Sequence, residues 1–325
     1  MRVLLTGAAG YIGSITTRTL LDRGHECIVL DNLVHGWRES VDARAQFIEG
    51  SVGDSEVVAR ALDGCDAVVH MAGLIEVAES QKNPDLYFRV NSLEPLVLLD
   101  AMRAADVKAL VFSSTAAVYG EPTRVPIAET ARTEPVNAYG ASKLAFERSV
   151  TDCESWGLRA VRFRYFNVAG AWPDGSVGEA HAPETHLIPR ILTAIRDGAE
   201  RVEVFGGDYA TKDGTCVRDY IHVCDLAAAH ALGIERLGAG EDGGVFNLGN
   251  GSGFSNLEVV RACMRAAGRE IEVMIGPRRE GDPAKLVASA ARAKSVLGWV
   301  PERAELDGIV ADAWRWHLAH PNGYR

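Results

Sequence analysis

Short apolar runs alternate with amphipathic stretches through the first half of the chain, and this alternation predicts the architecture. Six runs are predicted as strands: Val3–Thr6, Cys27–Asp31, Gln46–Glu49, Ala67–Met71, Ala109–Ser113 and Ala160–Phe163. Between them, Ile12–Asp22 and Ser55–Leu62 follow the helical period, and Gly24 closes the first of these helices. Strands and helices in repeated alternation predict an α/β fold with a doubly wound parallel sheet.

The rhythm loosens after about Asn167, where Gly- and Pro-rich stretches separate shorter predicted strands. These strands are Val202–Phe205, Val217–His222, Val245–Leu248 and Glu272–Ile275. We interpret residues 1–168 as a dinucleotide-binding domain of the Rossmann type and residues 169–325 as a smaller α/β domain for the substrate. A segment of about 216–249 is expected to return to the first domain.

Pro95 falls inside a predicted helix that starts at Pro84 and runs to about Ala105. Proline removes one backbone hydrogen bond and clashes with the preceding turn of a helix. We therefore expect the helix to kink within Asn91–Pro95.

The charge balance excludes several classes of partner. The chain has 325 residues, with 34 Lys and Arg against 44 Asp and Glu, and a net charge of -10. An acidic chain without basic runs is a poor candidate for binding nucleic acid or an anionic membrane. No segment resembles a signal peptide or approaches the ~20 apolar residues of a membrane span.

The cysteines and histidines give no sign of a disulfide framework or a metal site. The six cysteines are scattered without a C-x-x-C pair, which is typical of thiols in a reducing compartment, so we expect a cytoplasmic protein. The nine histidines show no spacing typical of zinc ligands, and His317 and His320 lie near the end of the sequence without companions.

A glycine motif with the spacing G-x-x-G-x-x-G follows the first predicted strand and opens the first helix. Gly7, Gly10 and Gly13 allow a sharp turn and a close approach of the backbone to a pyrophosphate at the helix N-terminus. The plain alternative is a tight turn that needs glycine for its own geometry. Asp31 ends the second strand, where a carboxylate binds the adenosine ribose diol and disfavours NADP, unless it only caps the loop. Arg38 lies nearby and weakens this preference for NAD.

Tyr139 and Lys143 are four positions apart in the sequence and therefore share a face if they lie on a helix. A neighbouring ammonium and a positively charged nicotinamide ring both lower the pKa of a phenol, which can then act as a general base. Such pairs also occur by chance on solvated helices. Upstream, Ser113 and Thr115 end a predicted strand, where ligands bind in doubly wound sheets and where a hydroxyl can hold a reacting oxygen.

Several further stretches extend this pattern over nearly the whole chain. They are Thr6–Gly13, Asp31–Leu33, His70–Gly73, Ser113–Gly120, Tyr139–Lys143, Arg164–Asn167, Asp213–His222, Asn247–Gly249 and Pro277–Asp282. In this order they resemble the extended short-chain dehydrogenase/reductase superfamily and, within it, the UDP-glucose 4-epimerase family of galactose metabolism. Asp213–His222 is the most specific of them.

The resemblance implies an isomerase that uses NAD to oxidise and re-reduce C4 of a UDP-hexose. It implies that Tyr139 moves the proton, Thr115 holds the oxygen and Lys143 also binds the nicotinamide ribose. The implied cofactor contacts are Gly7, Gly10, Tyr11, Ile12, Gly13, Asp31, Asn32, Gly36, Ser51, Val52, Met71, Ala72, Gly73, Asn91, Ser113, Tyr139, Lys143, Tyr165 and Phe166. The implied substrate contacts are Thr115, Asn167, His186, Leu187, Phe205, Arg218, Tyr220, Arg279, Asp282 and Leu286.

Arg218 and Arg279 are interpreted as diphosphate clamps because guanidinium matches phosphate geometry, although Arg218-Asp219 and Arg279-Glu280 also read as solvated charge pairs. The resemblance further implies a homodimer in which helices around 91–105 and 139–154 form a four-helix bundle. Candidate interface residues are Ala101, Met102, Leu144 and Phe146, which are equally compatible with an intramolecular core.

Some positions depart from the family pattern. Ile75 and Ser51 replace a lysine and an aspartate near the cofactor, so weaker cofactor affinity is expected, and His186 replaces an asparagine beside the diphosphate. Leu286 stands where the family often has a tyrosine beside the hexose, which predicts tolerance of UDP-N-acetylhexosamines. Ala116 and Ala117 replace the Asp-Glu pair of related dehydratases.

Three other functions remain open at this point. Two are enzymatic: a 4-epimerase acting on a UDP-pentose or UDP-glucuronate, and a nucleotide-sugar dehydrogenase with net NADH production. The third is a redox-sensing regulator, which would not need the Tyr139 and Lys143 pair.

Overall fold

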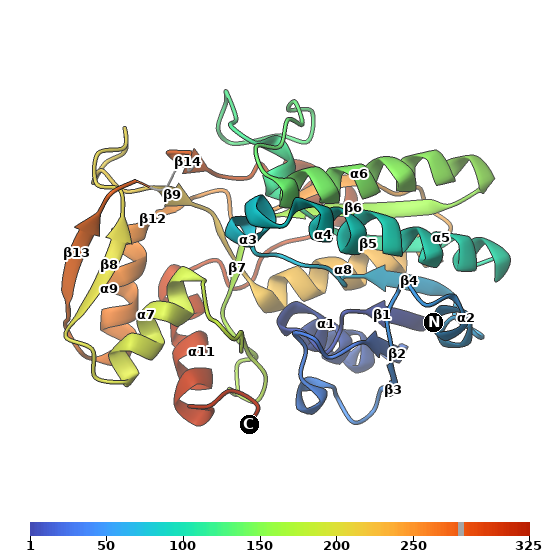
Figure 1. Ribbon diagram of the computed structural model, residues 1–325, viewed down its shortest axis with the longest axis horizontal. Coiled ribbons are helices and arrows are strands. Elements are labelled where there is room, and N and C mark those ends of the chain that lie inside the picture. Colours follow the sequence, from blue (N-terminus) through green and yellow to red (C-terminus); the bar gives the residue numbers. More distant parts are fainter. Residues whose placement is uncertain (279–282) are drawn as a thin grey trace.

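Figure 1 shows the computed structural model, which describes residues 1–278 and 283–325. Its central sheet has seven parallel strands in the order β11-β6-β5-β4-β1-β2-β3. Their bounds are β1 Arg2–Thr6, β2 Glu26–Asp31, β3 Gln46–Glu49, β4 Ala67–His70, β5 Ala109–Thr115, β6 Arg159–Tyr165 and β11 Gly244–Leu248. The predicted doubly wound α/β fold is confirmed, and each predicted strand of the first half is present.

Helices cover both faces of this sheet, and each strand therefore buries side chains on both sides. Val3 and Leu5 of β1 pack in one core with α1 and α8, whereas Leu4 packs in a second core with α2, α5 and α6. The bounds are α1 Tyr11–Asp22, α8 Val223–Gly238, α2 Ser55–Ala61, α5 Glu94–Ala104 and α6 Ala138–Cys153. Two-sided burial explains why β1, β2, β4 and β5 are mainly apolar runs, whereas the edge strand β3 is more exposed.

The second half forms a smaller layered unit beside the sheet (Figure 1). Its helices α7, α9 and α11 share a core, and its short strands form small sheets, β13-β8, β12-β9-β14 and β10-β7. The bounds are α7 Leu187–Arg196, α9 Asn256–Ala267, α11 Leu306–Ala319, β7 Asn167–Ala169, β8 Arg201–Phe205, β9 Val217–Arg218, β10 Tyr220–His222, β12 Phe254–Ser255, β13 Glu272–Gly276 and β14 Lys285–Leu286. Strand β11 joins the large sheet, as the return of about 216–249 predicts.

The predicted strand Val217–His222 is in fact two strands, β9 and β10, on either side of Asp219. The buried carboxylate of Asp219 accepts hydrogen bonds from the backbone N–H groups of Asn250, Gly251 and Ala288. Strand β9 pairs with β12 and β14, whereas β10 pairs with β7. Asp219 thus lies where the chain passes from one small sheet to another, and the prediction of one continuous strand was wrong.

The helical run around Pro95 is interrupted, as predicted. Helix α4 (Pro84–Phe88) is followed by a π-helical turn over Arg89–Leu93, and α5 begins directly before the proline. The missing N–H of Pro95 accounts for the change in hydrogen bonding at this point. The remaining helices are α3 Val77–Lys82 and α10 Ala291–Leu297.

The proposed interface residues on α5 and α6 belong mostly to the core of the chain itself. Met102 and Phe146 are 0% exposed and pack against the sheet, and Ala101 packs against the same core. Leu144 is 7% exposed and lies in a smaller cluster. Met102 and Phe146 therefore belong to the intramolecular core, which is the alternative that the sequence left open. Within the described residues, none of the helices has the length and apolar character needed to cross a membrane.

Candidate active site

The carboxyl ends of six adjacent strands carry nearly all of the predicted cofactor residues. They lie on the loop after β1 into α1, after β2, after β3 and after β4, and at the ends of β5 and β6. In order these are Gly7–Gly13; Asp31, Asn32 and Gly36; Ser51 and Val52; Met71–Gly73; Ser113; and Tyr165 and Phe166. This edge is where open α/β sheets bind ligands.

The glycine loop is shaped by close backbone packing. Gly7 has φ +71°, and a Cβ there would lie 2.5 Å from the Cα of Ala72. A Cβ on Gly13 would lie 2.4 Å from the Cα of Ala8. The first and third glycines are therefore needed by the turn and by packing, while Gly10 begins the helix as its N-cap. The turn and the open helix N-terminus together form a cradle suited to a pyrophosphate.

Asp31 is held against this loop. Its Oδ2 accepts a hydrogen bond from the Ala9 N–H at 2.9 Å, and its Oδ1 accepts one from the Leu33 N–H at 2.8 Å. A Cβ on Gly36 would lie 2.9 Å from both Ala9 Cβ and Asp31 Oδ1, so glycine keeps this space clear. Asp31 therefore does cap this loop, as the alternative interpretation predicted. Each carboxylate oxygen still has a further lone pair with which to bind a ribose hydroxyl.

Arg38, which was expected to weaken the NAD preference, lies over the Phe47 ring at 4.5 Å. Burial raises the pKa of Asp31, and the bonded N–H groups of the loop oppose that effect. The acidic residue therefore sits in a site whose nearest donors are backbone amides.

Three predicted cofactor residues form hydrogen bonds that hold the loops around the cradle. The Tyr11 hydroxyl donates to the carbonyl of Gly170 at 2.7 Å and so ties the first helix to the strand that leads into the second half. Asn91 accepts a hydrogen bond from the Leu74 N–H and donates to the Leu74 carbonyl and to Ser142. Ser51 lies 3.4 Å from Glu94, as donor to its carboxylate.

The predicted catalytic residues come together from two elements. Thr115 ends β5, and Tyr139 lies in the first turn of α6, whose start is capped by Asn137. The side chains of Tyr139 and Thr115 lie beside each other, close enough for Thr115 to act on the pKa of the phenol. One turn further along α6, Lys143 donates to the carbonyl of Ser113 at 3.3 Å.

The electrostatics of this group differ from expectation in one respect. Burial raises the pKa of Tyr139, Thr115 opposes that effect, and Glu76 adds to it. Burial lowers the pKa of Lys143 to about 8. The expectation that Lys143 lowers the pKa of Tyr139 is therefore not met in the chain by itself, because desolvation of the phenol is the larger effect.

A buried polar network lies behind the catalytic strand end. Arg164 binds Glu147 through two hydrogen bonds of 2.9 and 2.5 Å, and Glu147 also accepts one from Ser114. Arg164 donates further to the Tyr119 hydroxyl at 3.1 Å, which in turn donates to Asn247. Glu147 was missed by sequence reasoning, and the only available signal was its position one turn after Lys143.

The predicted substrate residues of the second half lie at the ends of its short strands and at the start of α7. Asn167 begins β7, Phe205 ends β8, Arg218 ends β9, Tyr220 begins β10, Leu187 begins α7 and Leu286 ends β14. Arg279 and Asp282 lie outside the described residues.

Arg218 donates to the carbonyls of Val217 and Pro283. Asp219 beside it is buried on backbone N–H groups, so the interpretation of these two residues as a solvated charge pair was wrong.

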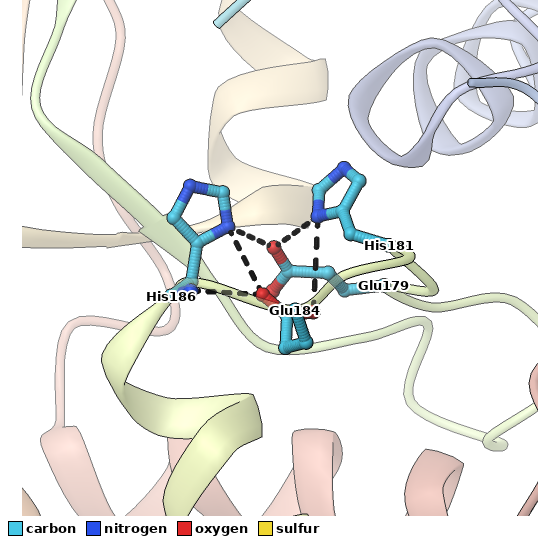
Figure 2. A group of neighbouring side chains, drawn as sticks. All are labelled: Glu179, His181, Glu184 and His186. Carbon is cyan, nitrogen blue, oxygen red and sulfur yellow. Dashed lines mark hydrogen bonds and ion pairs between the residues drawn. The ribbon is translucent and has the colours of Figure 1, made fainter. Parts of the chain in front are cut away.

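His186, expected beside a diphosphate, belongs to a cluster with Glu179, His181 and Glu184 (Figure 2). Its Nδ1 lies 2.6 Å from Glu179 Oε1. Burial alone would lower the pKa of His186, but Glu179 and Glu184 outweigh it and raise the pKa to about 9. The spacing of the histidines alone gave no sign of this cluster, in which two carboxylates lie beside two imidazoles.

Comparison with known proteins places this geometry in context. A model of the NAD dependent epimerase/dehydratase family matches residues 3–249. A UDP-glucose 4-epimerase of Lacticaseibacillus casei is 47% identical over 100% of this chain and 99% of that protein. A crystal structure of a UDP-glucose 4-epimerase is 43% identical, with a TM-score of 0.97 and 100% of both chains covered. The UDP-glucose 4-epimerase from Bifidobacterium longum in complex with NAD+ and UDP is 37% identical, with a TM-score of 0.93 over 99% of this chain and 100% of that one.

Proposed function

The chain belongs to the NAD dependent epimerase/dehydratase family, and from that premise we propose that it interconverts UDP-galactose and UDP-glucose by inverting C4. The observation that carries the proposal is the placement of Tyr139 beside Thr115, which is close enough to act on the pKa of the phenol. A phenol and an alcohol thereby lie side by side at the ligand-binding edge of the sheet. Ala116 and Ala117 follow Thr115, and neither can protonate a departing hydroxyl, which argues against dehydration.

NAD is the cofactor, and we propose that it lies across the carboxyl ends of the strands. The Gly7–Gly13 loop fits its pyrophosphate, and Asp31 fits its adenosine ribose, because Gly36 leaves open the space that a Cβ would fill. Lys143, fixed by the Ser113 carbonyl, is proposed to bind the nicotinamide ribose. When bound, NAD supplies a reversible hydride acceptor for C4 of the sugar.

The chain itself supplies the proton chemistry. Tyr139 is proposed to take the proton of the 4-hydroxyl group and to return it after the sugar has turned over, while Thr115 holds the same oxygen. Since burial raises the pKa of Tyr139, the phenol needs positive charge nearby to act as a base at neutral pH. Lys143 remains mostly protonated at neutral pH, because its pKa is lowered only to about 8.

Inversion requires that the nucleotide be held firmly and the hexose loosely. Arg218 is the proposed diphosphate ligand on β9, since a guanidinium pairs with phosphate oxygens in a bidentate way. From the sequence alone, Arg279 is proposed to bind the diphosphate and Asp282 the uridine ribose. The remaining proposed contacts are Asn167, His186, Leu187, Phe205, Tyr220 and Leu286.

The deciding experiment is to incubate the purified protein with UDP-galactose without added NAD. UDP-glucose is followed by chromatography and bulk NADH by absorbance. We expect UDP-glucose to appear without accumulating NADH, because the hydride returns to the same sugar. Stoichiometric NADH would identify a dehydrogenase instead. No conversion after adding NAD, with turnover of a UDP-pentose or UDP-glucuronate, would identify a related epimerase.

Leu286 is proposed to leave room for an N-acetyl group on the hexose. It packs beside the cluster of Phe166 and Leu144 near the catalytic strand end. We expect turnover of UDP-GlcNAc by the unmodified protein, and in Leu286→Tyr a fall of about 10- to 200-fold for this sugar, because the ring occupies the space. Leu286→Val serves as the control with an open pocket. Brisk turnover of UDP-galactose without any turnover of UDP-GlcNAc in the unmodified protein would contradict this role.

We also propose that the protein is a homodimer formed across α5 and α6. Support comes from apolar side chains left exposed at the start of this helical layer, with Leu93 60% and Leu96 38% exposed. Leu96→Arg is expected to shift sedimentation toward monomer, because a charge would have to be buried in the interface. Leu318→Arg, on α11, provides a control at another exposed leucine, 54% exposed, and is expected to leave the dimer intact. An unmodified protein that sediments only as monomer at micromolar concentration would reject the dimer.

The proposed location is the cytoplasm. All six cysteines are free thiols, four of them buried and two partly buried. Free thiols are typical of reducing compartments, where such side chains stay unpaired.

A further inference from the structure

Four side chains outside the proton-transfer group converge in the segment between β7 and α7. Glu179, His181, Glu184 and His186 follow one another with the spacing E-x-H-x-x-E-x-H, and Figure 2 shows their polar ends turned toward a common centre. One ligand atom from each lies within 4.8 Å of those of the other three. We propose that these residues bind one divalent transition-metal ion, with zinc as the best match.

The distances are close to those of a tetrahedral site. Ligands at about 2.0–2.1 Å from zinc stand about 3.3–3.4 Å from one another in a tetrahedron. The Nδ1 atom of His186 lies 2.6 Å from Glu179 and 3.6 Å from Glu184. The Nδ1 atom of His181 lies 3.1 Å from Glu179 and 3.8 Å from Glu184. Both imidazoles face the same oxygen of Glu179, at distances shorter than the tetrahedral edge. Glu184 offers a different oxygen to each imidazole, at distances longer than that edge, so its carboxylate has to move to enclose an ion.

The donor types and charges agree with this assignment. Two imidazole nitrogens and two carboxylates form a set that zinc accepts, whereas magnesium and calcium prefer oxygen ligands alone. Glu179 is 5% exposed, and a carboxylate so deeply buried is costly unless a positive charge balances it. A divalent cation balances both carboxylates while the imidazoles stay neutral. The competing arrangement is a set of imidazolium–carboxylate ion pairs without metal.

The backbone of this segment is fixed from outside, which favours a preformed site. The Trp316 indole donates to the Glu179 carbonyl, and the Trp37 indole donates to the Ala180 carbonyl, each at 2.8 Å. The N–H of His186 donates to Glu184 Oε1 at 2.8 Å, which orients that carboxylate. Anchoring of this kind lowers the ordering cost of binding and supports ligand orientation.

An entry route also exists. A cavity of about 180 Å³ is lined by Glu179, His181 and Glu184, and on its far side by His317 and His320 of the C-terminal region. An ion can therefore reach the carboxylates without opening the fold. Trp37 in the first half and Trp316 in the second already bind the segment before α7 by hydrogen bonds. The bound ion would fix that segment further.

Metal binding is testable on the full chain without any substrate. The purified protein is stripped with a chelator, titrated with Zn²⁺ by calorimetry, and titrated separately with Co²⁺ to record visible absorption. We expect one ion per chain and the intense visible bands of tetrahedral Co²⁺. His181→Gln and Glu179→Gln are each expected to weaken metal binding by at least about 10- to 100-fold. Losing a hydrogen-bond partner of a ligand typically lowers metal affinity by this factor, and losing the ligand itself lowers it further. His25→Gln, which removes a histidine beside Glu235 outside the cluster, is expected to bind like the unmodified protein.

The outcomes separate the metal site from the ion-pair arrangement and from the proposed activity. Absence of stoichiometric binding, or equal affinity in His181→Gln, would overturn the site. Circular dichroism of each metal-free variant establishes that it is folded, and the two variants together guard against a failure of either one. Since neither titration contains a UDP-sugar, failure of the proposed epimerase activity would leave the binding result intact.

Discussion

Tyr139→Phe is expected to lower kcat for UDP-galactose by about 10³-fold, because general acid–base catalysis typically contributes about 10² to 10⁴. The substitution removes only the hydroxyl that lies beside Thr115 and leaves the ring in the first turn of α6. Cofactor retention should change little, since Lys143 keeps its bond to the Ser113 carbonyl. The measurement compares kcat and bound NAD per chain for the two proteins.

Tyr165→Phe is the matched control for this experiment. Tyr165 ends the neighbouring strand β6, its hydroxyl is close enough to Ser113 for that residue to act on its pKa, and burial raises this pKa as it does that of Tyr139. Removing this hydroxyl perturbs the same site without removing the proposed base, so we expect a loss of about tenfold at most, in line with one lost neutral hydrogen bond. Equal losses in the two variants would mean that Tyr139 acts by packing, and a fully active Tyr139→Phe would remove the proposed mechanism.

The fold could be predicted because its strands and helices have strong local patterns. Strands β1, β2, β4 and β5 are buried on both faces, so each appears in the sequence as a mainly apolar run bounded by loop residues. The kink before Pro95 follows from covalent geometry alone. The carboxyl edge of a parallel sheet then gathers the glycine loop, Asp31 and Thr115 without further information.

The errors occur where long-range contacts decide. Asp219 breaks a continuous β pattern because its carboxylate binds backbone groups about 30 and 69 residues away. Phe146 packs against the sheet. The helical period of α6 does not determine whether such a residue faces the sheet or a partner subunit. The spacing of Tyr139 and Lys143 predicts that they share a helix face, but it cannot give the desolvation that governs both pKa values. The cluster around Glu179 mixes two residue types, so counting histidine spacings misses it.

The buried ion pair behind the active site is expected to have the largest effect on stability. Arg164→Met should lower the free energy of unfolding by about 3–5 kcal/mol, because it leaves the charge of Glu147 buried without its partner. The two side chains are 8% and 5% exposed, so water cannot replace the lost guanidinium. Chemical denaturation measures the change.

Arg162→Met is the matched control on the same strand. Arg162 lies two residues earlier on β6 and pairs with Glu154, whose side chain is 42% exposed. Loss of that pair leaves Glu154 in contact with water, so the expected cost is about 1 kcal/mol or less. A similar loss of stability in the two variants would show that the loss comes from packing of the arginine side chain and not from the unpaired charge of Glu147.

The double variant Arg164→Met with Glu147→Leu separates the charge from the network. When both charges are removed, no buried ion remains, and we expect the double variant to be more stable than Arg164→Met alone. In the double variant the Ser114 hydroxyl still loses its acceptor, the Glu147 carboxylate, and the Tyr119 hydroxyl loses its donor, Arg164. Full recovery of stability is therefore not expected. Because Ser114 immediately precedes Thr115, a stable but slow double variant would show that the ion pair holds the catalytic strand end in position. A double variant less stable than Arg164→Met would mean instead that Glu147 stabilises the fold without its arginine.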